Sequence, residues 1–175
     1  MSDFWVFGYG SLIWNPGFDH VERRRAQLHG LHRSLCIYSW VHRGTKESPG
    51  LVLGLDRGGS CQGIAMRAEA TKKSEVVDYL RARELVTSVY LECWRNIRLE
   101  SGETVPALVY RVDQSSPQYA QGLSLKDQTE IVSRAVGGSG KNVDYVRSTV
   151  AAMKREGIKD RVLETIESNL MTRAC

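Results

Sequence analysis

The sequence lacks long apolar runs, since no window approaches the roughly 18 to 20 consecutive apolar residues that a membrane-spanning helix needs. It also lacks a basic N-terminal segment with a small-residue cleavage site, the mark of a secretory signal. Neither repeats nor low-complexity stretches are present, which excludes collagen-like, coiled-coil and low-complexity classes. We therefore expect a cytoplasmic protein that does not bind membranes.

Cysteine is sparse, and the four residues are scattered without a C-x-x-C spacing: Cys36, Cys61, Cys93 and Cys175. A chain of 175 residues can bury enough apolar surface to fold without disulfide bonds. We predict that all four thiols are free.

Charge of one sign does not dominate, because 24 Lys and Arg residues face 20 Asp and Glu residues, for a net charge of +4. The densest basic run is Arg23–Arg25, next to Glu22. A nucleic-acid surface usually needs a larger basic stripe, so we expect a small anionic ligand or a solvated face instead.

The content of 42% hydrophobic and 25% charged residues is ordinary for a globular protein, and we predict one domain over residues 1–175.

Short apolar runs separated by turn residues fill most of the first two thirds of the chain. They predict strands at residues 4–7, 34–41, 51–55, 62–68, 86–99 and 104–112, with a turn at Asp56–Gly59 between two of them. One helix interrupts this pattern. It is predicted from Thr71, as N-cap, to about Glu84, because Val76, Val77 and Leu80 recur at helical spacing.

The last third of the chain has helical periodicity. Ser124 and Asp127 form a capping-box pattern at the start of a helix, for which Gly137 is the expected C-cap glycine. Asn142 and Asp160 are the expected caps of two further helices, which carry the apolar stripes Val143, Val146, Val150, Met153 and Leu163, Ile166, Leu170. Strands first and helices last, without a βαβ rhythm, predict an α+β fold.

Several familiar motifs are incomplete. Gly8-Tyr9-Gly10 lacks the third glycine of a dinucleotide fingerprint, because residue 13 is Ile. Residues 137–141 lack the flanking residues of a phosphate loop and are expected to form a helix-to-helix turn. Ser11 does not have the flanking glycines of a nucleophile elbow.

His29, His32 and Cys36 have a spacing that could ligate a metal ion. A third or fourth partner at a suitable spacing is not visible in the sequence. Histidines on a strand-edge surface are therefore the preferred interpretation.

The segment Gly8–Leu12 is a glycine-rich bend that directly follows a buried strand. Such a bend exposes backbone N–H groups that can converge on an anion or an oxyanion. The alternative is an ordinary turn whose two glycines adopt positive φ. The residues alone leave both interpretations open.

Glu84 is a candidate for proton transfer. It follows Val76 by eight residues and Leu80 by four, so it lies on the helix side that faces the core. Burial and the negative end of the helix dipole would raise the pKa of its carboxyl group toward a useful range. A salt bridge with Arg81 or Arg83 would lower this pKa instead, and both outcomes stay open.

Three further polar side chains are candidates for binding. Arg43 lies in a glycine turn and can pair bidentately with a substrate carboxylate. Tyr110 and Tyr145 can donate hydrogen bonds into a cleft. A solvated arginine and tyrosines that only pack are the alternatives.

A series of short motifs runs from residue 4 to about residue 170: Val6–Trp14, Arg43–Thr45, Pro49-Gly50, Gly63–Ala65, Arg83-Glu84, Ala107–Tyr110, Pro117 with Tyr119, Gly137–Gly140, and Asn142 with Tyr145. In order and spacing this series resembles the ChaC-type γ-glutamylcyclotransferases, a family that acts on glutathione. The residues after the Arg83-Glu84 pair look closest to the bacterial branch. Gly138 departs from the family pattern, which has proline there, and Ser39–His42 varies among members.

The resemblance implies a compact mixed β-barrel with surrounding helices, and a catalytic role for Glu84. It also implies a substrate-binding loop made of Tyr9, Gly10, Ser11 and Leu12, and neither a cofactor nor a metal. We expect Arg43, Tyr110 and Tyr145 to bind substrate as well. No heptad or interface stripe in the sequence indicates an oligomeric state.

The chemistry of such a substrate fits these residues. The α-amine of a γ-glutamyl amide is tethered at a five-membered-ring distance from its own γ-carbonyl, so no enzyme nucleophile is needed. Glu84 would act as general base and then as general acid, and glutathione would yield 5-oxoproline and Cys-Gly. The alternatives are a cyclotransferase for other γ-glutamyl peptides or γ-glutamylamines, and a non-catalytic binding module on the same fold.

Overall fold

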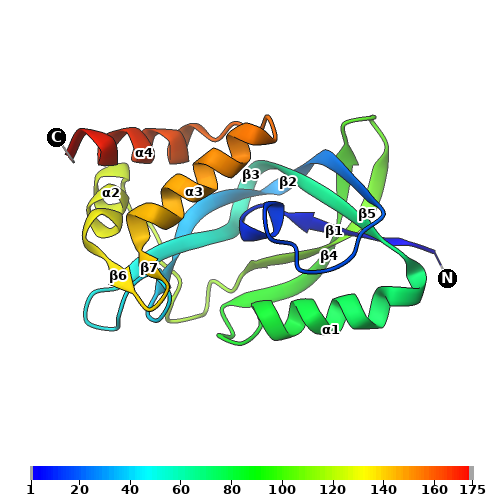
Figure 1. Ribbon diagram of the computed structural model, residues 1–175, viewed down its shortest axis with the longest axis horizontal. Coiled ribbons are helices and arrows are strands. Elements are labelled where there is room, and N and C mark those ends of the chain that lie inside the picture. The colour runs from blue at the N-terminus through cyan, green and yellow to red at the C-terminus, as the bar shows by residue number, and fades with distance from the viewer. Residues whose placement is uncertain (1, 174–175) are drawn as a thin grey trace. The chain divides into compact units, whose positions relative to one another are not determined.

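The computed structural model describes residues 2–173 (Figure 1). The strands are β1 (Phe4–Gly8), β2 (Glu22–Ser39), β3 (Gly50–Ala68), β4 (Tyr90–Leu99), β5 (Thr104–Val112), β6 (Val136–Gly137) and β7 (Gly140–Lys141). The α-helices are α1 (Lys73–Glu84), α2 (Leu125–Arg134), α3 (Asn142–Arg155) and α4 (Arg161–Arg173), and two 3-10 turns are η1 (Ser11–Ile13) and η2 (Ala70–Lys72).

These elements form two compact units. The first comprises the chain up to Ser34 together with Gly54–Ser116, and the second comprises Leu35–Leu53 and the chain from Pro117 onward. Strands β2 and β3 therefore contribute residues to both units, so that each unit is built from two separate parts of the chain.

Five strands close into a barrel in the order β1-β3-β2-β4-β5. Strand β1 runs antiparallel to β3, with Gly8 opposite Ile64, and parallel to β5, with Val6 opposite Leu108. Strands β4 and β5 form an antiparallel pair along their whole length. A barrel that combines both orientations, together with a helical C-terminal third, confirms the predicted α+β class and mixed barrel.

Strands β2 and β3 are longer than predicted, at 18 and 19 residues. The turn predicted at Asp56–Gly59 is wrong, because these residues lie inside β3. Gly58 and Gly59 have φ values of +94° and +66°, a conformation that glycine adopts without steric cost. The strand can therefore continue through a sequence that otherwise has the composition of a turn.

Helix α1 buries Val76 and Leu80 and ends at Glu84, as predicted. Its predicted start is wrong, since Thr71 lies within η2 and α1 begins at Lys73. The preceding turn is held from elsewhere, because Oδ1 of Asp3 accepts a hydrogen bond from the backbone N–H of Ala70. A distant carboxylate at this turn has taken the place of a local cap.

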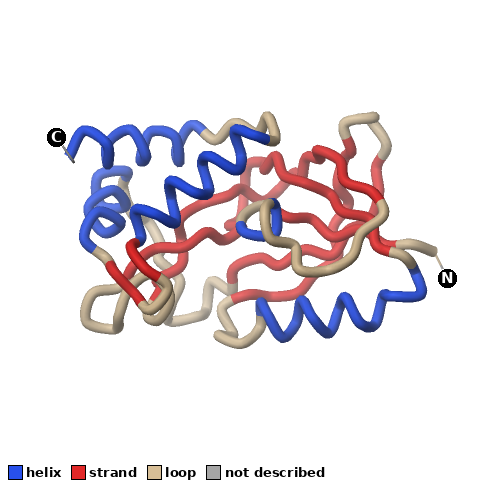
Figure 2. Tube along the Cα trace, in the orientation of Figure 1, coloured by secondary structure: helices blue, strands red, loops and turns tan. Residues whose placement is uncertain are grey.

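In the second unit, helices α2, α3 and α4 pack against one another in pairs (Figure 2). The predicted capping box of α2 is confirmed, as Ser124 and Asp127 bond reciprocally. Asp160 caps α4 by accepting from the N–H of Leu163. The prediction that Gly137 ends α2 is wrong, because the helix ends at Arg134 and residues 136–141 form the small β6–β7 hairpin.

Asn142 does not cap helix α3 with its side chain, contrary to prediction. The side chain is fully buried and bonds to a residue 91 positions away. Its Oδ1 accepts from the N–H of Leu51 and its Nδ2 donates to the carbonyl of Leu51, both at 2.8 Å. The amide thus satisfies one strand residue's donor and acceptor together, which a helix cap would not do.

The thiols of Cys36, Cys61 and Cys93 are free, as predicted, and the first two are buried. Cys175 lies outside the described residues. Across residues 2–173, no helix combines the length and the apolar character that crossing a membrane requires.

Candidate active site

The bend after β1 folds tightly back on the end of the strand. A Cβ atom on Gly8 would lie 3.1 Å from Cβ of Leu12 and equally close to Cε of Met66. Gly8 and Gly10 do not have positive φ, so close approach, and not an unusual dihedral angle, explains the glycine at position 8. This finding disfavours the interpretation as an ordinary positive-φ turn.

The chain then enters η1, where the N–H of Ile13 donates to the carbonyl of Gly10 at 2.9 Å. The first N–H groups of any helical turn have no partner within that turn. Gly10, Ser11 and Leu12, at the start of this turn, therefore carry backbone donors just after β1 ends.

Two arginines from β2 hold this loop from the barrel side. Arg33 is only 8% exposed, and it donates from Nε to the carbonyl of Tyr9 at 2.6 Å and from Nη2 to the carbonyl of Gln62. Arg23 donates from Nη2 to the carbonyl of Ile13 at 2.7 Å. These guanidinium groups fix backbone carbonyls at both ends of the bend.

Arg33 was missed by the sequence analysis, although the sequence holds a signal for it. Leu31 and Leu35 flank it at a spacing of two, and all three side chains are buried on β2. In a strand, residues at this spacing share a face. An arginine at an inward position needs partners, and here these are the carbonyls of Tyr9 in the loop and Gln62 in β3.

A third arginine, Arg83 near the end of α1, holds the loop from the helix side. It donates from Nη2 to Oγ of Ser11 at 2.8 Å and from Nη1 to the carbonyl of Asn15 at 2.5 Å. Its Nε also forms an ion pair with Oε1 of Glu84 at 3.4 Å. The loop after β1 and the last residue of α1 therefore meet at one side chain.

The Glu84 side chain is 16% exposed, at the C-terminal end of α1. Burial raises the pKa of its carboxyl group, and the nearby charge of Arg83 opposes this shift without cancelling it. The sequence suggested two opposing effects on this pKa, burial and a nearby arginine. Both occur, and the effect of burial is the larger. Arg81 does not compete for Glu84, because it forms two 2.9 Å hydrogen bonds with Glu92 on β4.

Tyr110 is buried on β5, directly opposite Glu92 on β4. Its hydroxyl group donates to Oε2 of Glu92 at 3.0 Å. Burial raises the pKa of Tyr110, and the negative charges of Glu92 and Glu84 add to the shift. The first unit thus brings together the loop Tyr9–Leu12, Glu84 and Tyr110, with Glu92 as a neighbour that the sequence analysis did not identify.

Arg43 and Tyr145 lie together in the second unit. The guanidinium carbon of Arg43 is 5.5 Å from the centre of the Tyr145 ring, a cation–π distance. Arg43 also donates from Nη1 to the carbonyl of Lys141 at 3.2 Å. The Tyr145 hydroxyl accepts from the N–H of Leu53 at 3.0 Å.

The loop that carries Arg43 is held by close backbone packing. A Cβ atom on Gly44 would lie 2.1 Å from the nitrogen of Gly50, and one on Gly137 would lie 2.4 Å from the nitrogen of Gly44. No side chain fits at these distances, so glycine is required at the contact points. These glycines come from three of the sequence motifs.

Within the described part of the chain, no group of three or more His, Cys, Asp and Glu side chains is arranged to hold a metal ion. Nδ1 of His32 lies 3.0 Å from the carbonyl oxygen of Gly58, and Cys36 is buried.

Comparisons with known proteins find relatives that match this chain over most of its length. The family model of the ChaC-like proteins matches residues 4–173. The "Glutathione-specific gamma-glutamylcyclotransferase" of Escherichia coli K12 is 33% identical over 156 residues, which cover 89% of this chain and 68% of that protein. The protein with the same description from Schizosaccharomyces pombe is 33% identical over 166 residues, covering 83% of this chain and 80% of the relative.

The fold is similar to that of a solved protein as well. A crystal structure of a γ-glutamyl cyclotransferase specific to glutathione from yeast superposes with a TM-score of 0.87 at 20% identity, covering 98% of this chain and 97% of the other. That likeness concerns the fold alone. Because the family model spans nearly all of the described residues and the E. coli relative shares a third of its aligned residues, the chain belongs to the ChaC-like protein family.

Proposed function

We propose that this protein is a γ-glutamylcyclotransferase that cleaves glutathione to 5-oxoproline and Cys-Gly. The observation that carries the proposal is the position of Glu84, a largely buried carboxylate with a raised pKa next to an arginine-anchored glycine loop. The names of the E. coli and S. pombe relatives support glutathione as the substrate.

The reaction needs a folded substrate and a moved proton. The α-nitrogen attacks the γ-carbonyl carbon of the same glutamyl group, so one C–N bond forms and closes a five-membered ring. The amide C–N bond to cysteine then breaks. Glu84 accepts one proton from the α-ammonium group and passes it to the departing nitrogen, so one carboxyl group serves as base and then as acid. The ring nitrogen loses its second proton as the released amine becomes an ammonium group. The scheme uses no cofactor or metal.

A raised pKa suits Glu84 to this exchange. An ordinary carboxylate is a weak base toward an ammonium group, and burial brings the two pKa values closer together. The raised pKa makes the protonated carboxyl group a weaker acid. It can still give its proton to the departing nitrogen, because an amine nitrogen is a stronger base than a carboxylate.

The loop Tyr9–Leu12 is the proposed site for the oxyanion of the tetrahedral intermediate. Its backbone donors follow the end of a strand. Three arginines fix this part of the chain by donating to the carbonyl of Tyr9, the hydroxyl of Ser11 and the carbonyl of Ile13. Donors that are fixed before the reaction stabilise developing charge without reorganisation.

Tyr110 is proposed to accept a hydrogen bond from the substrate's α-ammonium group. The hydrogen bonds from Arg81 keep the pKa of Glu92 below its ordinary value, so Glu92 is ionised and can only accept. The hydroxyl hydrogen of Tyr110 therefore points to Glu92, and lone pairs remain for a donor. This assignment reverses the donor role expected from the sequence.

Arg43 is the proposed contact for a substrate carboxylate, and the ring of Tyr145 supports its guanidinium group. Glutathione carries two carboxylates, and a guanidinium fork can pair with one of them bidentately.

We also propose that residues 1–175 act as a single functional domain, and the cytoplasmic location stays a prediction.

The test is mass spectrometry of the purified protein incubated with reduced glutathione and without added metal. We expect the wild type to release 5-oxoproline and Cys-Gly. Glu84→Gln keeps the size of the side chain but cannot exchange the proton, so turnover should fall by roughly 10² to 10⁴-fold while substrate binding survives. Near-normal turnover of this variant would rule out the role of Glu84. Cleavage of γ-glutamyl-alanine without cleavage of glutathione would move the substrate to other γ-glutamyl peptides.

A further inference from the structure

We propose that Arg83 is a positioning residue that couples the substrate loop to the proton-transferring glutamate. The inference rests on the proposed function of Glu84 and of the loop Tyr9–Leu12. It concerns a residue that touches both, through separate nitrogen atoms of one guanidinium group.

The three nitrogens of Arg83 have different partners. Nη2 donates to Oγ of Ser11 at 2.8 Å, and Nη1 donates to the carbonyls of Asn15 and Pro16 at 2.5 and 3.3 Å. Nε faces Oε1 of Glu84 at 3.4 Å. The guanidinium group is planar, so these partners are held in fixed relation to one another. A movement of the loop therefore moves the charge that faces Glu84.

The contact is shielded from solvent, which makes it stronger than a surface pair. The side chains of Arg83 and Glu84 are 20% and 16% exposed. Salt and water screen such a pair much less than an exposed one. Arg23 and Arg33 hold the same loop from β2, but Arg83 adds the pairing with Glu84.

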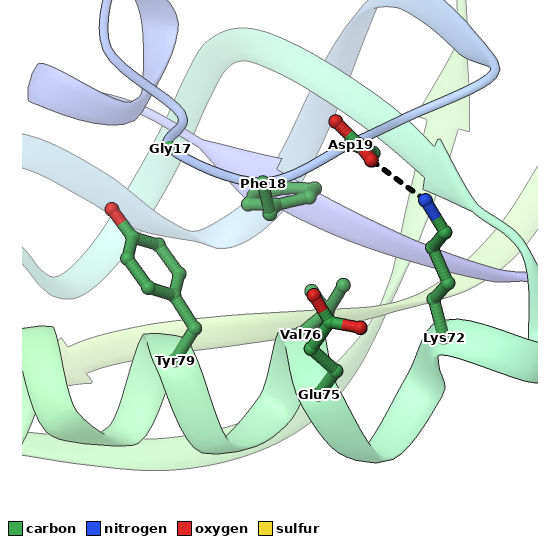
Figure 3. Close-up of a pocket in the computed structure, with 7 residues that line it drawn as sticks. All are labelled: Gly17, Phe18, Asp19, Lys72, Glu75, Val76 and Tyr79. Atoms are coloured by element: carbon green, nitrogen blue, oxygen red, sulfur yellow. Dashed lines mark hydrogen bonds and ion pairs between the residues drawn. The ribbon is translucent and has the colours of Figure 1, made fainter.

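Tyr79 of α1 contacts the next part of this loop, because a Cβ atom on Gly17 would lie 1.8 Å from its hydroxyl oxygen. A cavity of about 290 Å³ lies beside this contact, lined by Gly17–Asp19 and by residues of the helix, and the side chains of Phe18 and Tyr79 border it (Figure 3). At its far rim, Lys72 pairs with Asp19 at 2.6 Å, and the Asp19 side chain is 84% exposed. Exposed pairs contribute little to stability. Of the contacts between α1 and the loop, the one through Arg83 also reaches Glu84.

Two contributions of Arg83 can be separated by substitution. Its charge favours the ionised form of Glu84, and a lysine at this position would keep that charge. Its fork spans the partners on the loop, and a lysine ammonium would not span them. Arg83→Lys thus removes the fork alone, whereas Arg83→Gln removes both.

The experiment compares the wild type, Arg83→Lys, Arg83→Gln and Arg25→Gln as control. Arg25 is an exposed arginine of the same unit that pairs with Glu100. The pH dependence of kcat/KM with glutathione is measured for each protein, and amide hydrogen exchange is followed in residues 9–16. The exchange measurement needs no substrate and no activity.

We expect kcat/KM of Arg83→Lys to fall roughly 10- to 100-fold from misplacement of the loop, with the acid limb of the profile unchanged. For Arg83→Gln the acid limb should also move to higher pH, because Glu84 loses the charge that opposes its burial. Both variants should exchange faster at residues 9–16, and Arg25→Gln should match the wild type.

The inference is wrong if Arg83→Gln keeps the acid limb of the wild type, or if exchange in the loop is unchanged in both variants. A variant that merely loses stability would lower activity without moving the limb. If Arg83→Gln does not fold, Arg83→Lys still tests the inference through its amide hydrogen exchange in residues 9–16 and through the size of its kcat/KM. If the wild type releases no 5-oxoproline, the proposed function fails and the coupling with it, while exchange still shows whether Arg83 holds the loop.

Discussion

Tyr110 donates its hydroxyl hydrogen to Glu92 across the β4–β5 pair, at 3.0 Å and in direct register. Glu92 in turn receives two 2.9 Å hydrogen bonds from Arg81 of helix α1. The chain of three groups sets the direction of the phenol before any substrate binds. An orientation that is fixed in advance lowers the entropic cost of binding.

Replacement of this hydroxyl group should therefore impair catalysis. Tyr110→Phe is expected to reduce kcat/KM for glutathione by roughly 10- to 100-fold, the usual effect of losing a hydrogen bond to a charged group. Glu92→Gln should also reduce kcat/KM. The glutamine amide can donate to the Tyr110 oxygen, so the phenol hydrogen no longer points to residue 92 and can turn toward the substrate amine. Steady-state kinetics of both variants checks this, and a fully active Tyr110→Phe enzyme would contradict the assignment.

Glu84 should cost the folded protein stability at neutral pH. Its pKa is raised above the ordinary value of 4.5 by burial, so the folded state binds the proton more tightly than the unfolded chain. Its contribution is most favourable below the unfolded pKa and is lost as the pH rises through the folded pKa. Glu84→Gln should therefore increase the free energy of unfolding at neutral pH, and the gain should vanish below about pH 4.

Urea unfolding of both proteins at the two pH values measures this difference. A glutamine variant that is less stable at neutral pH would show that the pairing with Arg83 outweighs burial.

Arg43 should affect substrate binding more than turnover. If its guanidinium group holds a substrate carboxylate equally in the ground state and the transition state, Arg43→Ala should raise KM for glutathione by roughly tenfold or more and leave kcat nearly unchanged. Lys46→Ala, an exposed cation of the same loop, is the control. An unchanged KM would mean that the carboxylate contact does not exist.

Asn142 should be important for stability. Asn142→Ala leaves the N–H and the carbonyl of Leu51 without this partner in a buried place, at a cost of roughly 2 to 4 kcal/mol. Asn169→Ala on the exposed face of α4 should change stability by less than about 0.5 kcal/mol. Denaturant titration compares the two, and equal stabilities would overturn the prediction for Asn142.

Parts of the fold could be predicted because neighbouring residues determine them. The apolar run before Gly8 forms a strand, the Ser124–Asp127 box starts a helix, and the spacing to Leu80 puts Glu84 on the inner side of α1. Each is a short-range pattern in which propensity, capping and periodicity agree.

Other predictions failed where a distant group replaced a local one. Thr71 is not a cap, since Asp3 reaches the turn before α1. Asparagine often caps helices, but the side chain of Asn142 bonds to the backbone of Leu51 instead. Residues with the composition of a turn at Asp56–Gly59 continue as a strand, because pairing with neighbouring strands outweighs local preference.

The sequence by itself determined the family, the order of strands and helices, and the inward position of Glu84. The tertiary structure alone decided the partners, because they are far apart in the chain: Arg33 and Tyr9 by 24 residues, Arg83 and Ser11 by 72. Periodicity reports which face of an element is buried, but it carries no information on which segment will meet that face. Hydrogen bonds and pKa shifts depend on that meeting, so the chemistry of the site emerges only once the chain is folded.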